Sequence, residues 1–594
     1  MRAPIEWLRA LAIPRVGAGL RGAWASGYGL SDLRSDVLAG LTIGLVAVPL
    51  SMALAIATGV APQHGLYTAI VAGAVIALTG GSRYSVSGPT AAFVVILFPI
   101  VQQYGLGGLL IATLMAGVFL VVLGLAGLGT LIQLVPYPVV LGFTAGIAVV
   151  IATLQLPDFL GLSAGTPSEH YVDNLVRIGQ SLPTMNPLEL GVGVLTLAVL
   201  LLWPRLRLPV PLPAPLVGLV AGTLVAYLVN FLAGGTGLEI DTIASRFEWT
   251  TAERSGVGIP PVAPAFALPW TLPGPDGRPM VVNLELIQAL LGPALAIAVL
   301  GAIESLLCAV VADGMTRTRH DPNAELVGQG LGNMIVPFFG GITATAAIAR
   351  TATNVRSGAR SPVAALVHAM VVLLAIVAMA GLLSLVPMAA LAALLFVIAW
   401  NMAEVRHFLH TLRSAPPGDV AVLLVCFGLT VIFDMVVAVA VGIGLASALF
   451  IRRMALVTRT SRVPAVAEPY GTGLPSAVAV YDIDGPLFFG AADKAISSLR
   501  EVDRGIRVVI VDMNDVPSID ATAIAALRAL VDDMRRHRVA MILVGLSPEK
   551  IVKLRRSGIR TARGLLTHCR DHAQAQRIAR RWLGDSAGGG EAVT

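Results

Sequence analysis

Charged residues are scarce in this sequence: lysine, arginine, aspartate and glutamate together make up 13% of its 594 residues, about half the share found in soluble domains. Hydrophobic residues make up 56% of the chain, and its mean hydropathy is +0.81. A soluble enzyme of ordinary composition is therefore excluded. The composition indicates a protein that crosses a membrane several times.

Cysteine is also scarce, with three residues in the whole chain, Cys308, Cys426 and Cys569. They lie far apart and show no spacing typical of a metal site, so we expect neither a metal nor a cofactor. The sequence also lacks a Walker A motif and a dinucleotide fingerprint, which argues against ATP-driven pumping. We expect a protein that is not an enzyme and that binds no nucleic acid.

Long apolar segments follow one another from about Val37 to about Ala455. A membrane-spanning helix needs roughly 20 apolar residues, and on this basis we count about fourteen spans, several of them short. After Arg453 short apolar strands alternate with polar helices, which is typical of a small α/β domain. The predicted domains are an N-terminal segment (1–36), a transmembrane domain (37–455), an α/β domain (456–583) and a disordered tail (584–594). The expected span centres are Val46, Ala72, Ala91, Met115, Ala148, Leu197, Val220, Val299, Met334, Ala349, Leu373, Leu394, Leu424 and Gly444.

Basic residues gather in the loops on one side of the membrane when these spans are threaded in order. Examples are Arg83, the pair Arg205 and Arg207, and the pair Arg317 and Arg319. The opposite loops carry mixed charge, as residues 234–283 do. Because lysine and arginine concentrate in cytoplasmic loops, we expect both termini, and with them the α/β domain, to be cytoplasmic.

Glu304 lies inside an apolar run, residues 291–311, that is long enough to cross a bilayer. A carboxylate in such a run is costly, and it normally faces the interior of a helix bundle or a watery cavity on an ion or proton pathway. One interpretation is a coupling carboxylate that takes up and releases a proton during a transport cycle. The alternative is a structural residue that is hydrogen-bonded between packed helices.

Two interrupted, hydroxyl-rich segments occupy equivalent places in the two halves of the transmembrane domain. Residues 85–93 read SVSGPTAAF, near the third predicted span, and residues 340–350 read GGITATAAIAR, near the tenth. Such pairs are typical of an inverted repeat with its substrate site between two half-helices. The free N–H groups and positive dipole ends of the half-helices favour an anion.

Several stretches resemble the sulfate permease (SulP) family of anion transporters, over nearly the whole chain. They are residues 36–49 (DVLAGLTIGLVAVP), 65–69 (GLYTA) and 87–90 (SGPT), Glu304 in the eighth span, and the C-terminal domain, which is similar to a STAS domain. The stretches that look most like bacterial C4-dicarboxylate uptake permeases are residues 80–97, 301–311 and 325–333.

The resemblance implies an all-α membrane domain of two inverted seven-span repeats, followed by the STAS domain. Core spans 1 to 4 and 8 to 11 would carry the substrate past gate spans 5 to 7 and 12 to 14, in an elevator-like movement within a homodimer. The implied location is the lipid bilayer of a bacterial inner membrane.

Arg350 follows the second interrupted segment, at the mouth of its half-helix. In the site interpretation its guanidinium pairs with Glu304 or with a bound carboxylate, which it fits bidentately. The alternative is an arginine that snorkels from a helix end.

The hydroxyl groups of the two segments either cap the half-helices, bind the substrate, or do both. These are Ser87, Thr90, Thr343 and Thr345. Leu50 and Leu54 match pocket positions of the family, and their aliphatic side chains suit a substrate with a methylene stem. The predicted substrate-binding residues are Leu50, Leu54, Ser87, Thr90, Ala91, Ala347, Ile348, Ala349 and Arg350, and Glu304 is the predicted proton-coupling residue.

We predict secondary active uptake of a small anion together with protons, with C4-dicarboxylates such as succinate, fumarate and aspartate as preferred substrates. The alternatives are a sulfate or bicarbonate transporter, and a passive anion channel or transceptor that signals through the STAS domain. Soluble relatives of this domain carry a phosphorylatable hydroxyl before a helix. Here Ala521 replaces the expected serine and Thr522 is the remaining candidate. A soluble cytoplasmic protein is a candidate STAS partner.

Overall fold

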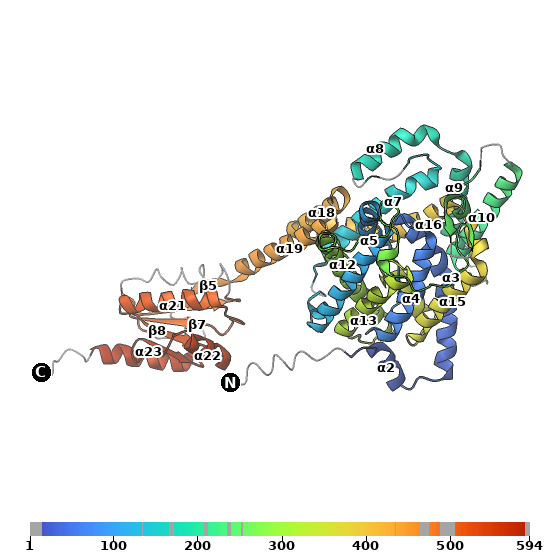
Figure 1. Cartoon of the computed structure of the whole chain (residues 1–594). Coiled ribbons are helices and arrows are strands. Elements are labelled where there is room, and N and C mark those ends of the chain that lie inside the picture. Colours follow the sequence, from blue (N-terminus) through green and yellow to red (C-terminus); the bar gives the residue numbers. More distant parts are fainter. Residues whose placement is uncertain are drawn as a thin grey trace. The chain divides into compact units, whose positions relative to one another are not determined.

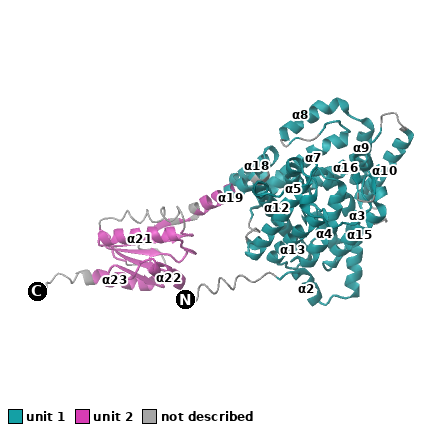
Figure 2. Cartoon of the chain, in the orientation of Figure 1, with its two compact units in different colours: residues 1–444 teal, residues 445–594 magenta. Residues whose placement is uncertain are grey.

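The computed structural model describes residues 15–132, 135–165, 168, 171–206, 212–233, 239–250, 254–433, 435–463, 474–487 and 505–587. The chain divides into two compact units, Met1–Gly444 and Leu445–Thr594, which Figure 2 shows in different colours. This division falls inside helix α19 (Met435–Val457), whereas the sequence-based boundary lies near the end of that helix. The apolar pattern follows the helix to its last turn and therefore places the boundary later.

The first unit is built almost entirely of helices (Figure 1). Besides α19, its main helices are α2 (Ala18–Ala25), α3 (Leu30–Ala57), α4 (Pro62–Thr79), α5 (Ala91–Leu125), α7 (Tyr137–Leu160), α8 (Tyr171–Ser181), α9 (Pro187–Leu202), α10 (Ala214–Ala233), α12 (Leu284–Thr316), α13 (Pro322–Ile335), α14 (Ile348–Arg356), α15 (Val363–Ser384), α16 (Met388–Met402), α17 (Val405–Ser414) and α18 (Pro417–Ile432). Every predicted span centre lies in one of these helices. Helix α5 contains two of the centres, on either side of Gly105, whose φ of 67° interrupts the helix.

Nine helices within the described residues are long and apolar enough to cross a membrane. Helix α13 has 14 residues and α14 has 9, so neither crosses the hydrocarbon alone, because a span needs roughly 20 residues. The unit is thus a polytopic membrane domain in which interrupted helices accompany complete ones.

The helices of this unit pack in two groups. Helices α3, α4, α5, α12, α13, α14 and α15 contact one another closely, and so do α7, α9, α10, α16 and α18. A smaller number of contacts, such as those of α16 with α3, joins the groups. The grouping agrees with the core and gate spans that the resemblance implied, and we call the two sets the core group and the gate group.

Close packing inside the core group depends on small residues, as it does between membrane helices in general. At Gly65 of α4, a Cβ atom would lie 2.0 Å from the carbonyl oxygen of Ser51 on α3. Any side chain would therefore push the two helices apart. This close approach explains the glycine of the GLYTA stretch.

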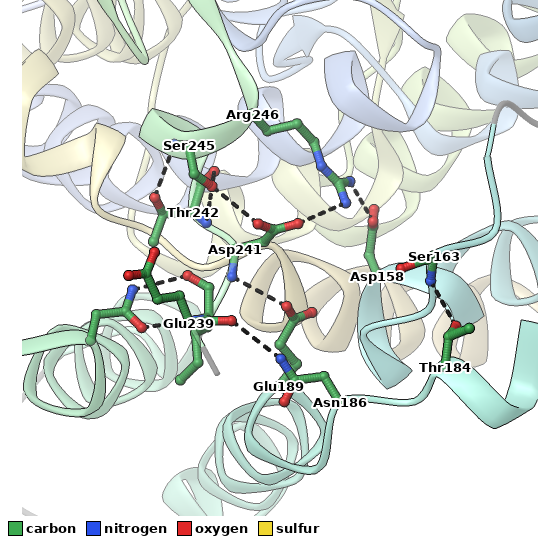
Figure 3. Close-up of polar contacts among 12 residues, drawn as sticks. Asp158, Ser163, Thr184, Asn186, Glu189, Glu239, Asp241, Thr242, Ser245 and Arg246 are labelled. Carbon is green, nitrogen blue, oxygen red and sulfur yellow. Dashed lines mark hydrogen bonds and ion pairs between the residues drawn. The ribbon is translucent and has the colours of Figure 1, made fainter. Parts of the chain in front are cut away.

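A polar cluster fastens the loop after α10 to the ends of gate helices (Figure 3). Arg246 pairs with Asp158 at 2.5 Å and with Asp241 at 3.3 Å. Glu189, in the first turn of α9, accepts a hydrogen bond from the backbone N–H of Asp241 at 3.2 Å. The carbonyl group of Asp241 accepts a hydrogen bond from the N–H of Met388 at 2.9 Å. The loop thereby connects α7, α9 and α16.

The second unit is an α/β domain. Its five described strands lie in the order β5-β6-β7-β8-β9, with β5 antiparallel to β6 and the remaining neighbours parallel. The strands are β5 (Arg459–Val463), β6 (Val478–Asp484), β7 (Val508–Asp512), β8 (Ala540–Val544) and β9 (Leu566–Cys569), and the described helices are α21 (Ala521–Arg536), α22 (Pro548–Arg556) and α23 (His572–Ala587).

Helices cover both faces of this sheet. Val509 and Val511 of β7 pack in a core with α21 and α22, while Val508 and Ile510 pack in a second core with α23. Side chains alternate between the two faces along a strand, and a strand that is buried on both faces is apolar throughout. Thr522 is exposed in the first turn of α21.

Asp36, the first residue of the family-like stretch 36–49, is fully buried and joins α3 to the turn between α14 and α15. Its carboxylate accepts hydrogen bonds from the N–H groups of Arg360 at 2.6 Å and Ser361 at 3.1 Å. It also accepts from the hydroxyls of Ser361 at 2.5 Å and Tyr28 at 2.8 Å.

We predict that Asp36→Ala lowers the free energy of unfolding by about 3 kcal/mol, because it leaves several buried donors without an acceptor. The measurement is thermal unfolding of the purified protein in detergent. The control is Asp32→Ala, one turn earlier in α3, where the carboxylate accepts, among the described residues, a hydrogen bond from the exposed N–H of Gly29. Equal losses in the two variants would contradict the role assigned to Asp36.

Candidate anion-binding site

The two interrupted segments meet in the middle of the core group. Strand β1 (Ser87–Gly88) pairs antiparallel with β4 (Thr345–Ala346). Helix α5 begins three residues after β1 and α14 begins two residues after β4. Antiparallel pairing of segments from equivalent places in the two halves is what a two-fold related repeat produces. The structure therefore brings two helix N-termini to one place.

The first turns of both helices have no side-chain cap. Thr90 and Ala347 are the N-cap residues of α5 and α14, and neither accepts a hydrogen bond from its helix through a side chain. The N-terminal N–H groups of a helix have no partner inside the helix, and they carry the positive end of the helix dipole. These two ends can therefore bind an anion through their backbones.

None of the four hydroxyls caps a half-helix, so the capping interpretation is wrong. Thr90 Oγ1 donates to Glu304, and Ser87 Oγ accepts from Gln329 Nε2 at 3.0 Å. Thr345 Oγ1 donates to the carbonyl of Gly301 at 3.0 Å. Thr343 Oγ1 lies 2.7 Å from the Thr113 hydroxyl. The hydroxyls instead join the interrupted segments to neighbouring helices.

Glu304 lies on α12 and faces the N-terminus of α5. Its Oε2 accepts the hydrogen bond from Thr90 Oγ1 at 3.0 Å, and its side chain is half-buried. A carboxylate at this place can change its hydrogen bond to the N-cap residue when it gains a proton. The structure thus connects Glu304 with the half-helix.

Arg350 is the third residue of α14 and is only 2% exposed. Its Nη2 donates to the carbonyl oxygen of Pro89, while Nε and Nη1 have no hydrogen-bond partner among the described residues. Glu304 acts on it electrostatically, but the described part of the chain holds no ion pair to Arg350 within 4.0 Å. This burial contradicts the interpretation of Arg350 as a snorkelling residue. A buried cation with free N–H groups is costly unless an anion compensates it.

The other predicted site residues lie on the same helices or on α3. Ala91 and Ala347 stand at the starts of α5 and α14, and Ile348 and Ala349 are exposed on the first turn of α14. Leu50 and Leu54 lie on α3, which packs against α14. Leu50 is half-buried and Leu54 is 2% exposed.

A buried carboxylate that the sequence reasoning missed, Glu325 of α13, holds the segment that leads into β1. Its Oε2 accepts from the N–H groups of Gly81 and Ser82, each at 2.9 Å. Its Oε1 accepts from the hydroxyl of Ser305 at 2.9 Å and from Gln329 Nε2 at 3.2 Å. In the sequence Glu325 stands only within the family-like stretch 325–333, and no local pattern singles it out.

Side-chain amides and hydroxyls satisfy further backbone groups of the interrupted segments. Asn333 accepts from the N–H of Ala344 at 2.8 Å and donates to the carbonyl of the same residue at 2.8 Å. Thr351 accepts from the N–H of Val86 at 3.0 Å, and Asn354 donates to the carbonyl of Tyr84 at 2.8 Å. Both interrupted segments are thus fixed on either side of the β1–β4 pair.

Gly88 sets the position of the Arg350 guanidinium. A Cβ atom at Gly88 would lie 2.5 Å from Arg350 Nη1. We predict that Gly88→Ala displaces the guanidinium and weakens anion binding by about tenfold, the effect of roughly 1.4 kcal/mol of overpacking. Calorimetric titration of the purified protein with substrate measures this effect.

The control for this variant is Gly314→Ala in α12, where a Cβ atom would meet nothing within 4 Å. Its substrate affinity should equal that of the unmodified protein. Full affinity in Gly88→Ala would show that the guanidinium position does not matter for binding.

Comparisons with known families agree with this architecture. The model of the sulfate permease family matches residues 33–426, and that of the STAS domain matches residues 473–563. YvdB of Bacillus subtilis, which is provisionally named a sulfate transporter, is 42% identical over 537 residues, covering 90% of this chain and 95% of that protein. The bicarbonate transporter BicA of Picosynechococcus sp. is 28% identical over 549 residues, covering 86% of this chain and 89% of BicA.

Two solved structures have similar folds. The structure of SLC26A9 has a TM-score of 0.77 at 17% identity and covers 95% of this chain and 93% of that one. The transmembrane domain of a cyanobacterial BicA has a TM-score of 0.57 at 27% identity, covering 71% of this chain and 98% of that one. The predicted fold class, a polytopic helical domain followed by a STAS domain, is confirmed.

Proposed function

Because the chain belongs to the sulfate permease family, we propose that it is a secondary active transporter of small oxyanions, with sulfate as the preferred substrate. Bicarbonate is the second candidate. The proposal includes proton coupling through Glu304, a homodimer in a bacterial inner membrane, and both termini in the cytoplasm.

The observation that carries this proposal is the buried guanidinium of Arg350 beside two uncapped helix N-termini. Two of its nitrogen atoms, Nε and Nη1, have no partner among the described residues. An oxyanion has several acceptor atoms and can take hydrogen bonds from a guanidinium and from backbone N–H groups together. The arrangement favours an anion over a cation as the cargo.

The comparisons support an inorganic oxyanion better than the C4-dicarboxylate expected from the sequence. The two relatives described above are named for sulfate and bicarbonate, and no comparison supports dicarboxylate specificity. The argument from an aliphatic pocket wall also loses strength, because Leu54 is only 2% exposed. Backbone N–H groups bind any small oxyanion, which suits a compact tetrahedral dianion as well as a carboxylate.

The two helix groups support an elevator-like movement. The half-helices, Glu304 and Arg350 all belong to the core group, whose helices contact one another more closely than they contact the gate group. The binding elements can therefore move together. Glu304 would take up its proton within the same moving group, so that anion and proton cross together.

The test of the proposed function is uptake of radiolabelled sulfate into proteoliposomes, driven by an imposed pH difference. We expect accumulation against the sulfate gradient, and stronger competition by excess sulfate than by succinate, fumarate or aspartate. Arg350→Ala should weaken sulfate uptake more than bicarbonate uptake, because it removes one positive charge beside a dianion. Arg356→Ala, an exposed residue of the same helix, should change neither.

Two outcomes would contradict this proposal. Stronger competition by succinate would restore the dicarboxylate assignment. Uptake that stops when the inside and outside concentrations are equal, with the pH difference still present, would indicate a passive channel.

Glu304→Gln should abolish pH-driven accumulation, because glutamine keeps the acceptor for the Thr90 hydroxyl but cannot take up a proton. Exchange of internal for external sulfate should remain, since the anion site keeps its donors. The matched control is Glu285→Gln, an exposed carboxylate in the first turn of the same helix. Uphill transport by Glu304→Gln at the normal rate would exclude Glu304 as the coupling residue.

A further inference from the structure

Helix α17 connects two apolar helices of the gate group, α16 and α18. Glu404, which has a φ of 42°, separates α17 from α16, and Pro416 lies between α17 and α18. Trp400, near the end of α16, is 69% exposed, and tryptophan is enriched where a membrane meets water. Tyr137, at the start of the neighbouring helix α7, is exposed as well. These aromatic residues indicate that α17 lies at the level of the lipid headgroups.

The apolar residues of α17 form one face of the helix. Val405, Phe408, Leu409 and Leu412 follow the i, i+3, i+4, i+7 spacing of an amphipathic helix. Phe408 packs against Phe427 of α18, with ring centroids 5.5 Å apart, while Leu409 is 44% exposed. None of the ten residues of α17, all of which the structure describes, is buried. Part of the apolar face therefore rests on the gate group, and the rest is open to an apolar neighbour.

The opposite face of α17 is basic. Arg406, His410 and Arg413 follow the spacing i, i+4, i+7, and all three are exposed. The helix itself contains no aspartate or glutamate. Among the described residues, no ion pair includes Arg406 or Arg413, because the adjacent Glu404 pairs instead with His407 at 2.9 Å. The helix thus offers two permanent positive charges next to an apolar edge.

Helix α8 is amphipathic as well, but it differs from α17 in charge. Its exposed apolar residues include Val172, Leu175 and Val176, while Asp173 and Arg177 give it one charge of each sign. A basic amphipathic helix binds anionic lipid in particular, since each lysine or arginine near such a surface contributes about 1 kcal/mol. The charge of α17 therefore favours an anionic lipid over a neutral one.

We propose that α17 is a binding site for anionic phospholipids. Arg406 and Arg413 contact the phosphate of the headgroup, because a guanidinium pairs with phosphate oxygens through two hydrogen bonds. Leu409 faces the start of the acyl chains. Since α17 joins α16 to α18, a bound lipid ties the gate group to the membrane surface. The site lies outside the half-helix N-termini, and its occupation does not depend on which anion is transported.

The test is a lipid titration of the full chain, purified in a non-ionic detergent and followed by native mass spectrometry. Phosphatidylglycerol should bind more tightly than phosphatidylcholine with the same acyl chains. Arg406→Gln and Arg413→Gln should each weaken phosphatidylglycerol binding by about fivefold, which corresponds to about 1 kcal/mol. Arg413→Lys should keep most of the affinity, because it keeps the charge.

The matched control is Arg319→Gln, which removes an exposed arginine from the loop after α12. It should bind phosphatidylglycerol as the unmodified protein does. Equal affinity of the unmodified protein for the two lipids, or equal losses in Arg319→Gln and the α17 variants, would overturn the proposal.

Two further outcomes would assign α17 to another partner and would also overturn the proposal. Displacement of phosphatidylglycerol by millimolar glycerol 1-phosphate would show that a soluble phosphate suffices. Full phosphatidylglycerol affinity in the α17 variants, together with a changed oligomeric state, would make the helix a contact between protein chains.

Discussion

A polar backbone group at the depth of a bilayer needs a partner in the protein or must line a watery cavity, and the arrangement of the candidate anion site reflects this constraint. An interrupted helix leaves N–H and C=O groups that have no partner inside the helix. The β1–β4 pair satisfies part of them. Glu325, Asn333, Thr351 and Asn354 satisfy the segments on either side. The first turns of α5 and α14 have no side-chain cap, so their backbone donors can face a ligand.

The same need for hydrogen-bond partners explains how the core group can contain the permanent positive charge of Arg350. Arg350 donates one hydrogen bond to the Pro89 carbonyl, which orients the guanidinium without neutralising it. Glu304 acts on it from a distance and is itself bound to Thr90. A direct ion pair between Glu304 and Arg350 would neutralise both charges and remove the reason for an anion to bind. Because the described residues hold no such pair, the charge of Arg350 stays available to an anion.

Much of this architecture follows from sequence patterns. Apolar runs give the helix positions, because a bilayer requires long apolar helices. The two hydroxyl-rich interruptions indicate the half-helices, because their residues cannot complete a span. The partners of buried polar groups do not follow in this way. Glu325 binds backbone groups more than 240 residues away, and only the folded chain brings these together. Capping was one of the roles considered for the hydroxyls, because local rules apply to near neighbours, whereas Thr90 and Ser87 bond to distant helices.

The two half-helix N-termini and Arg350 do little to determine which anion binds. The donors of the candidate site are mainly backbone N–H groups and the guanidinium of Arg350. Neither kind of donor distinguishes one anion from another by the shape of its remaining atoms. Selection of the substrate is therefore left to the residues around the two half-helix N-termini. In this chain those residues include the exposed Ile348 and Ala349 at the start of α14 and the half-buried Leu50 of α3. Discrimination between a tetrahedral dianion and a longer dicarboxylate has to come from such side chains, since the backbone donors accept both.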